Sequence, residues 1–274
     1  MSRSLIGTKT LSFSSGKGGV GKTSLLVNVA MGLSERGQKV LIFDGDLGLS
    51  NVEIFFNQRP KGHILEVMEG HKELSEVITP LYENLDLISG GHGLIEAARL
   101  NAFSRKSLID AVTSMERRYD YLLIDTAPGI GDNVLYLNAA AQQIMIVITP
   151  DAASVTDSYA LIKLLHQIHG EKKFNIICNQ VRDENEGLGL FSRFNEVVNR
   201  FMCIGLDYAG SIPHDTVYKR SSQSQRLLHK MEAKVEALQH LGKLVANIQN
   251  RNRSQASLDK GGLQFFWEQV VGVA

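Results

Sequence analysis

The sequence predicts an α/β protein in which a mostly parallel β-sheet of about seven to eight strands is flanked by helices on both faces. Two observations predict this class. Short, nearly continuous runs of β-branched and aliphatic residues alternate with longer segments of helical periodicity. A glycine-rich stretch also follows the first apolar run and precedes the first helical segment, as in α/β sheets that bind phosphate groups.

The expected elements alternate along the chain. The strands are expected over residues 10–14, 39–43, 85–88, 120–124, 143–148, 174–178 and 206–212. The helices between them are expected over residues 22–36, 104–118, 132–141, 154–169 and 187–202. Because parallel strands need crossover connections, this alternation indicates repeated strand–helix–strand units. A stripe of apolar residues over 222–249 predicts one final helix packed on the sheet.

No repeat or flexible linker interrupts residues 1–250, which are expected to form one domain. Residues 251–261 are polar and predict a tether, and residues 262–274 predict a C-terminal amphipathic helix. One face of that helix carries its large apolar side chains, namely Leu263, Phe266, Trp267, Val270 and Val271. Such a face suits a membrane surface or a partner protein, but the segment has no net basic charge to favour anionic lipid.

Composition excludes several classes of protein. The chain has 274 residues, with 29 Lys and Arg against 29 Asp and Glu, so no global charge attracts nucleic acid and direct DNA binding is not expected. The two cysteines form neither a CxxC motif nor a zinc-ligand pattern, which fits a reducing cytoplasm and argues against an iron–sulfur carrier. No apolar run reaches the roughly 18 residues that span a bilayer.

The strongest motif is G-K-G-G-V-G-K-T at residues 16–23, which matches the P-loop pattern G-x-x-x-x-G-K-[ST]. Its glycines allow backbone N–H groups to surround phosphate oxygens at a helix N-terminus. Lys22 is expected to contact the β- and γ-phosphates, and the Thr23 hydroxyl to bind Mg²⁺. The expected nucleotide-binding residues of this loop are Gly16, Gly18, Gly19, Val20, Gly21, Lys22, Thr23 and Ser24.

Three aspartates follow apolar strands, where open α/β sheets bind ligands. Asp125 opens D-T-A-P-G after Y-L-L-I and is expected to hold Mg²⁺ through water, while Gly129 lets this loop shift as a second switch. Asp44 and Asp46 follow V-L-I-F. Asp44 is expected to support the Mg²⁺ shell and the loop geometry, although strand-end carboxylates also occur for solubility alone.

Lys17 makes the loop resemble the deviant Walker motif K-G-G-x-G-K-[ST] of the MinD/ParA class of P-loop ATPases. The resemblance implies that Lys17 reaches the nucleotide of the facing subunit in an ATP-bound homodimer, and that Asp46 orients the attacking water. It also implies that Asn179 contacts adenine and that I-P-x-D, with Pro213, closes over the base; a plain strand-end cap remains the alternative for Asn179. A GTPase N-K-x-D motif is absent, so ATP with Mg²⁺ is expected.

Further motifs resemble the flagellar-number ATPases of this class, known as FlhG or FleN. They are D-G-D-L-G-L-S-N-V, T-P-D-A-A-S-V-T-D-S-Y-A-L-I-K and Y-A-G-S-I-P-H-D-T-V, within residues 10–221. The resemblance implies a slow ATPase switch that controls flagellar number or placement through a membrane, a transcription activator or a flagellar GTPase. No D-Q-A-x-x-L-R segment precedes the first strand, so stimulation of a GTPase is not predicted. An ATP-gated anti-activator with incidental hydrolysis, and a chromosome- or division-site-positioning ATPase, remain alternatives.

Overall fold

The computed structural model describes residues 7–46, 51–91, 119–224, 226–228 and 235–254. Eight strands form one sheet in the order β3-β4-β2-β5-β1-β6-β7-β8. Their bounds are β1 Lys9–Ser14, β2 Val40–Gly45, β3 Thr79–Tyr82, β4 Leu85–Ile88, β5 Tyr121–Thr126, β6 Gln143–Ile148, β7 Phe174–Val181 and β8 Leu206–Pro213. Neighbouring strands are parallel except at the β3–β4 pair. The predicted fold class and the seven predicted strands are thereby confirmed.

The prediction missed strand β3, which pairs antiparallel to β4 at the edge of the sheet. Its four residues alternate between buried and exposed side chains and include Pro80. So short a segment carries no distinct periodicity, and a proline is compatible with an edge strand because one side of that strand needs no ladder bond. The parallel strands were recognisable because both of their faces are buried.

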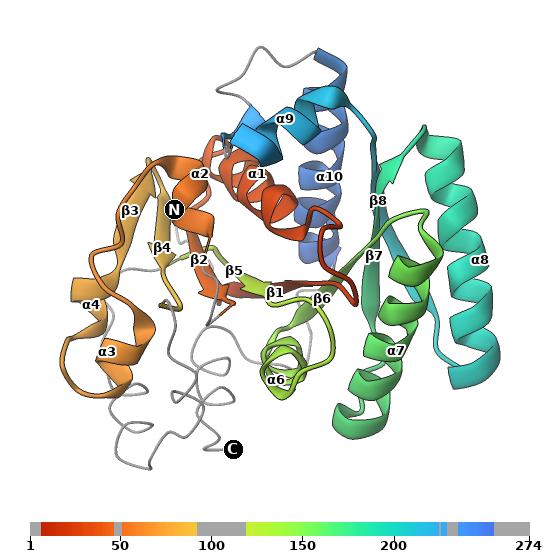
Figure 1. Cartoon of the computed structure of the whole chain (residues 1–274), viewed down its shortest axis with the longest axis horizontal. Coiled ribbons are helices and arrows are strands. Elements are labelled where there is room, and N and C mark those ends of the chain that lie inside the picture. Colours follow the sequence, from red (N-terminus) through yellow and green to blue (C-terminus); the bar gives the residue numbers. More distant parts are fainter. Residues whose placement is uncertain (1–6, 47–50, 92–118, 225, 229–234, 255–274) are drawn as a thin grey trace.

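Helices cover both faces of the sheet (Figure 1). One face carries α1 Lys22–Ser34, α2 Val52–Phe56, α9 Thr216–Ser224 and α10 Val235–Ser254. The other carries α3 Ile64–Met68, α4 Leu74–Val77, α6 Asp132–Ala140, α7 Ala152–His169 and α8 Glu184–Met202. The helix predicted over residues 104–118 lies outside the described residues.

The prediction of a single final helix over residues 222–249 was wrong. Helix α9 ends at Ser224, and α10 begins at Val235 and continues to Ser254, past the expected domain boundary. Between them Arg226 bonds back to Ser221, its N–H at 3.1 Å from the Ser221 carbonyl. Leu227 and Leu228 of the apolar stripe are fully buried in the core outside an α-helix. The described part of the stripe is therefore not one continuous helix.

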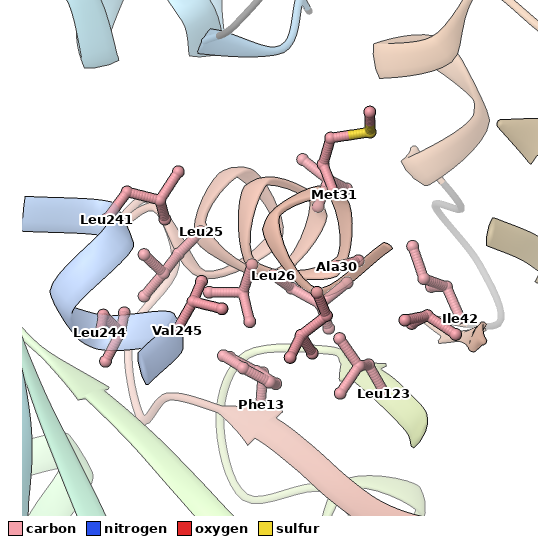
Figure 2. Close-up of a cluster of buried hydrophobic side chains, with 14 of the residues drawn as sticks. Phe13, Leu25, Leu26, Ala30, Met31, Ile42, Leu123, Leu241, Leu244 and Val245 are labelled. Atoms are coloured by element: carbon pink, nitrogen blue, oxygen red, sulfur yellow. The ribbon is translucent and has the colours of Figure 1, made fainter. Parts of the chain in front are cut away.

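Helix α1 packs on the sheet beside α10 (Figure 2). Leu26 and Ala30 on α1 face Phe13 of β1, while Leu25 contributes to the same cluster as Leu241 of α10. Burial of each such aliphatic side chain stabilises the fold by roughly 1.5–3 kcal/mol. This packing fixes the helix whose N-terminus forms the phosphate loop.

Candidate nucleotide-binding site

The N-terminus of α1 is open to a ligand. Its N-cap residue is Gly21, which has a φ of 87° and supplies no side-chain hydrogen bond to the first turn. The first N–H groups of a helix have no partner within the helix, and together with the helix dipole they favour an anion. A Cβ on Gly21 would lie 2.6 Å from the Asn179 Nδ2 atom, so both the backbone angle and the space demand glycine.

Lys22, Thr23 and Asp125 meet directly beneath this loop. The Lys22 Nζ atom lies 2.5 Å from Asp125 Oδ1, and the Thr23 hydroxyl donates to Asp125 Oδ2 at 2.6 Å. Both charged side chains are buried, with 7% of Lys22 and 2% of Asp125 exposed. A hydroxyl and a carboxylate side by side are the hard oxygen donors that Mg²⁺ takes when phosphates complete its shell. These donors therefore fit the expected metal.

Asp44 organises the loop that follows β2. It lies opposite Asp125 in the register of β2 and β5. Its carboxylate accepts N–H groups from Asp46 at 3.2 Å, Asn51 at 3.0 Å and Val52 at 3.3 Å. Burial, together with the charge of Asp125, raises the pKa of Asp44 to about 7, against the opposing effect of these backbone donors. The geometry suits the loop-ordering half of its expected role better than direct coordination of a metal.

Lys17 stands on the rim of the cleft. Its side chain is 40% exposed, and its Nζ atom forms an ion pair with Asp151. Asp151 is the N-cap of α7, where it also accepts the Ala153 N–H at 3.0 Å. The hydrogen bond from Lys17 lowers the pKa of Asp151 below its ordinary value. In this structure, then, the signature lysine has an anionic partner within its own chain.

The start of the phosphate loop is pressed against α7. A Cβ on Gly16 would lie 2.1 Å from the carbonyl carbon of Asp157, so a glycine is required by the close approach of the helix backbone. The N–H of Gly16 also lies 3.4 Å from the Ser158 hydroxyl. Gly16 thus packs the start of the loop against α7, and it is not among the residues that line the cleft.

The second switch segment contacts the first residues of the phosphate loop. Gly129 has a φ of 96°, and its N–H donates to the carbonyl of Ser15 at 2.9 Å. A positive φ is readily available to glycine alone, so the turn after β5 depends on this residue. Pro128, its neighbour, lines the cleft. This places the predicted switch at the phosphate end of the site.

A cleft of about 630 Å³ joins these groups to the strand ends of β7 and β8. It is lined by the predicted residues Lys17 to Ser24, Asp46, Asn179 and Pro213. The Asn179 Nδ2 atom donates to the Val20 carbonyl at 2.7 Å, which ties the far wall to the phosphate loop. No local sequence pattern predicts this contact between Val20 and Asn179.

Several lining residues were not predicted, namely Asn51, Phe55, Gln180, Tyr218 and Gln223. Asp151 was missed as well, although an aspartate immediately before a helical pattern is a signal for an N-cap. Gln180 has a φ of 59°, a conformation that no local pattern announces. Tyr218 and Gln223 reach the cleft from α9, whose position depends on contacts with distant segments.

Some expectations lie outside the described residues. The apolar face of residues 262–274, with Leu263, Phe266, Trp267, Val270 and Val271, belongs to this group, as does the later part of the expected tether; its first residues, 251–254, are helical in α10. Across the parts of the chain that the structure describes, no helix is both long enough and apolar enough to cross a bilayer. Nor do the described His, Cys, Asp and Glu side chains gather in threes around a metal position.

Comparison with known proteins agrees with this geometry. The family described as an AAA domain matches residues 8–178. The antiactivator FleN of Pseudomonas aeruginosa is 34% identical, with 96% of this chain and 93% of FleN covered. The flagellum site-determining protein YlxH of Helicobacter pylori is 29% identical, with 96% and 90% covered.

Among solved structures, the septum site-determining protein MinD from Pyrococcus horikoshii, complexed with Mg-ADP, superposes with a TM-score of 0.70 at 22% identity. The match covers 92% of this chain and all of that one. Similarity at this level supports the fold, and the closer sequence relatives support the family. The chain therefore belongs to the MinD/ParA family of P-loop ATPases.

Proposed function

We propose that the protein is an ATP-dependent dimerising switch that regulates flagellar number or placement. One observation carries the nucleotide-binding part of the proposal: Lys22, Thr23 and Asp125 converge within 2.5–2.6 Å beneath the open N-terminus of α1. That arrangement offers a cation, a hydroxyl, a carboxylate and unpaired backbone donors to one triphosphate. The flagellar part rests on FleN and YlxH as relatives over almost the whole chain.

The missing N-K-x-D motif supports ATP over GTP. At the base end of the cleft, one N–H of the Asn179 amide donates to the Val20 carbonyl, so Oδ1 and the second N–H are available to a base. Pro213 belongs to the same end of the cleft. Direct competition between ATP and GTP for the purified protein tests this preference.

The roles of the phosphate-end residues follow from their positions. Lys22 exchanges Asp125 for phosphate oxygens when a nucleotide binds, and Thr23 and Asp125 then face the metal side. Mg²⁺ would neutralise charge that develops on the phosphates. Asp46 lies on the cleft wall and positions the attacking water, while the three N–H bonds to Asp44 hold its loop. Release of phosphate frees Gly129 and its loop to shift.

Dimerisation requires Lys17 to change partners. In one chain it pairs with Asp151; across a dimer it would reach the phosphates bound by the facing subunit. ATP shifts the population towards the dimer only as far as the dimer binds ATP better than the monomer does. The Lys17–Asp151 pair is exposed, and surface ion pairs contribute little to stability, so the exchange of partners costs little.

Biochemical tests separate binding, dimerisation and hydrolysis. Lys22→Ala should remove ATP binding, and Asp46→Ala should retain binding and ATP-dependent dimerisation while hydrolysis falls by about 100-fold or more. Lys163→Ala, at an exposed position on α7, is the matched control for loss of a lysine. Hydrolysis at the wild-type rate in Lys22→Ala would refute the assignment of this cleft.

The cellular test is a count of flagella per cell in a strain that lacks the gene. Altered number or placement, restored by the wild type but not by Lys22→Ala, is the expected result. Normal flagella accompanied by misplaced septa or missegregated DNA would retain the ATPase chemistry and transfer the role to division-site or chromosome positioning. That alternative is supported by the similarity of the chain to septum site-determining MinD proteins.

A second candidate function is an ATP-gated anti-activator of transcription, favoured by the name of the relative from Pseudomonas aeruginosa. In that case binding of a transcription activator is the output and hydrolysis is incidental. Asp46→Ala would then preserve biological activity while Lys22→Ala abolished it. A switch that must cycle loses activity in both variants.

The tail forms a separate part of the proposal. The sequence of residues 262–274 predicts an amphipathic helix after a polar tether, and its role is to dock on a membrane or a partner. A single such helix binds lipid weakly, and two on one dimer gain avidity. Flotation with anionic vesicles should therefore show more binding in ATP than in ADP. Equal binding in the two nucleotides, or none, would remove the membrane role.

A further inference from the structure

Helix α9 forms one wall of the cleft and is held there by its neighbours. Tyr218 and Gln223 both line the cleft. Tyr218 also extends beyond it, because its hydroxyl donates to the carbonyl of Ala237 on α10 at 2.6 Å. Burial, with a smaller effect from Asp215, raises the pKa of Tyr218 above its ordinary value, so the hydroxyl remains a donor throughout the neutral range.

A second bond holds the far end of this wall. Asn28 is 3% exposed on α1 and lines the cleft floor. Its Oδ1 atom accepts the backbone N–H of Leu228 at 3.0 Å, across 200 positions of sequence. The segment between α9 and Leu228 is closed locally by Ser221, whose hydroxyl lies 2.5 Å from the carbonyl of Arg226. The wall is thus anchored to α10 at one point and to α1 at another.

These anchors are needed because α9 has only nine residues. An isolated helix of that length is not stable in water. Asp215 secures its first turn by accepting the Val217 N–H at 2.9 Å, but this bond does not fix where the helix lies on the protein. The position of α9 relative to the phosphate loop depends on Tyr218, Asn28 and the buried leucines that follow.

We propose that Tyr218 and Asn28 are positioning residues for the nucleoside half of the bound nucleotide: through Ala237 and Leu228 they hold α9 as the wall against which a purine nucleoside binds. The proposal rests on the proposed function, which places ATP in this cleft. Phosphate recognition at Lys22 and Thr23 does not involve α9. Loss of either anchor should therefore weaken binding of the base and ribose and leave binding of the phosphates unchanged.

The test compares ATP with inorganic tripolyphosphate, which offers phosphates without a nucleoside. Both compete with a fluorescent ATP analogue for wild type, Tyr218→Phe and Asn28→Ala. Tyr218→Phe loses the bond to Ala237, while Asn28→Ala loses both the bond from Leu228 and a bond from its Nδ2 atom to the Ser24 carbonyl. ATP affinity should therefore fall roughly three- to tenfold in each variant. Affinity for tripolyphosphate should stay within about twofold. The kcat at saturating ATP should also stay within about twofold, so that KM carries the effect.

Tyr208→Phe is the matched control, since it removes the hydroxyl of a partly buried tyrosine on β8 outside the cleft and should leave both affinities unchanged. Equal loss of ATP and tripolyphosphate affinity would overturn the proposal by showing a general structural role, and so would unchanged ATP affinity in Tyr218→Phe, the variant least disturbing to the fold. If wild type itself binds no ATP, the proposed function fails together with this inference. If wild type binds ATP and both variants match it, only this inference fails.

Discussion

Three helix N-termini lie at the same edge of the sheet, and they differ in how their first N–H groups are hydrogen-bonded. The N-cap residue of α1 is Gly21, which provides no side-chain cap. The N-cap residue of α7 is Asp151, whose carboxylate accepts the Ala153 N–H. Helix α2 is capped from a neighbouring strand, because Asp44 accepts the N–H groups of Asn51 and Val52.

The difference shows how one sheet edge can separate binding from support. An N-terminus capped by a carboxylate is already satisfied and repels a phosphate. One without a cap is stable only when water or a ligand takes the N–H groups. The glycine at α1 therefore costs some helix stability in exchange for a phosphate site, while the aspartates at α7 and β2 fix the surrounding loops.

The largest effect is expected at Gly21, where the uncapped N-terminus of α1 forms the phosphate site. Gly21→Ala should weaken ATP binding by about 100-fold, because the residue keeps a φ of 87° only with strain and its Cβ lies 2.6 Å from Asn179. Isothermal titration with ATP and Mg²⁺ measures the change. Gly37→Ala is the matched control, since Gly37 has a φ of 75° with open space around it and lies outside the cleft. Comparable losses of ATP affinity in the two variants would show that backbone strain alone is responsible.

The carboxylate that caps α2, Asp44, should make the free energy of unfolding depend on pH. Its pKa is raised from 3.8 to about 7, so the folded protein binds this proton more tightly than the unfolded chain does. The free energy of unfolding should therefore fall as pH rises from about 5 to 7, and this fall should be smaller in Asp44→Asn by about 1–2 kcal/mol. Urea unfolding without nucleotide at the two pH values gives the difference. Parallel pH profiles for wild type and variant would contradict it.

The smallest effect is expected at Asp151. Asp151→Asn keeps a side chain that can cap α7 but removes the charge that holds Lys17, so ATP-dependent dimers should form at roughly fivefold lower protein concentration. Analytical ultracentrifugation with ATP follows this shift. Asp183→Asn is the control, because Asp183 caps α8 in the same way by accepting the Glu186 N–H. A fall in dimer affinity in Asp151→Asn would indicate that the pair supports the dimer.

The residues at the phosphate end of the cleft were predictable from sequence, whereas at the base end only Asn179 and Pro213 were predicted. Residues 16–24 are contiguous, and their spacing reflects a local turn that must meet a phosphate. Asp125 was found because it directly follows the apolar run Y-L-L-I of the buried strand β5. Tyr218 and Gln223 were missed because α9 is placed by Ala237 and Leu228, contacts that no short window of sequence contains.

The same reason explains the error at the end of the chain. The apolar stripe over 222–249 has helical spacing, and spacing alone cannot show that Leu228 gives its N–H to Asn28 instead of an α-helical carbonyl. Strand β3 was missed because its four residues are too few to show a periodic pattern. In each case a tertiary contact or an edge position decided the local structure.

The position of β1 has a consequence for synthesis on the ribosome. This strand is made first, yet both of its neighbours, β5 and β6, begin after residue 120. The cleft floor at Asn28 is completed only by Leu228. Contacts of such sequence separation form late, because the intervening chain must be available before they close. A nascent chain that carries only the phosphate loop therefore lacks a complete nucleotide site, and the switch cannot be loaded before nearly all of the protein has been translated.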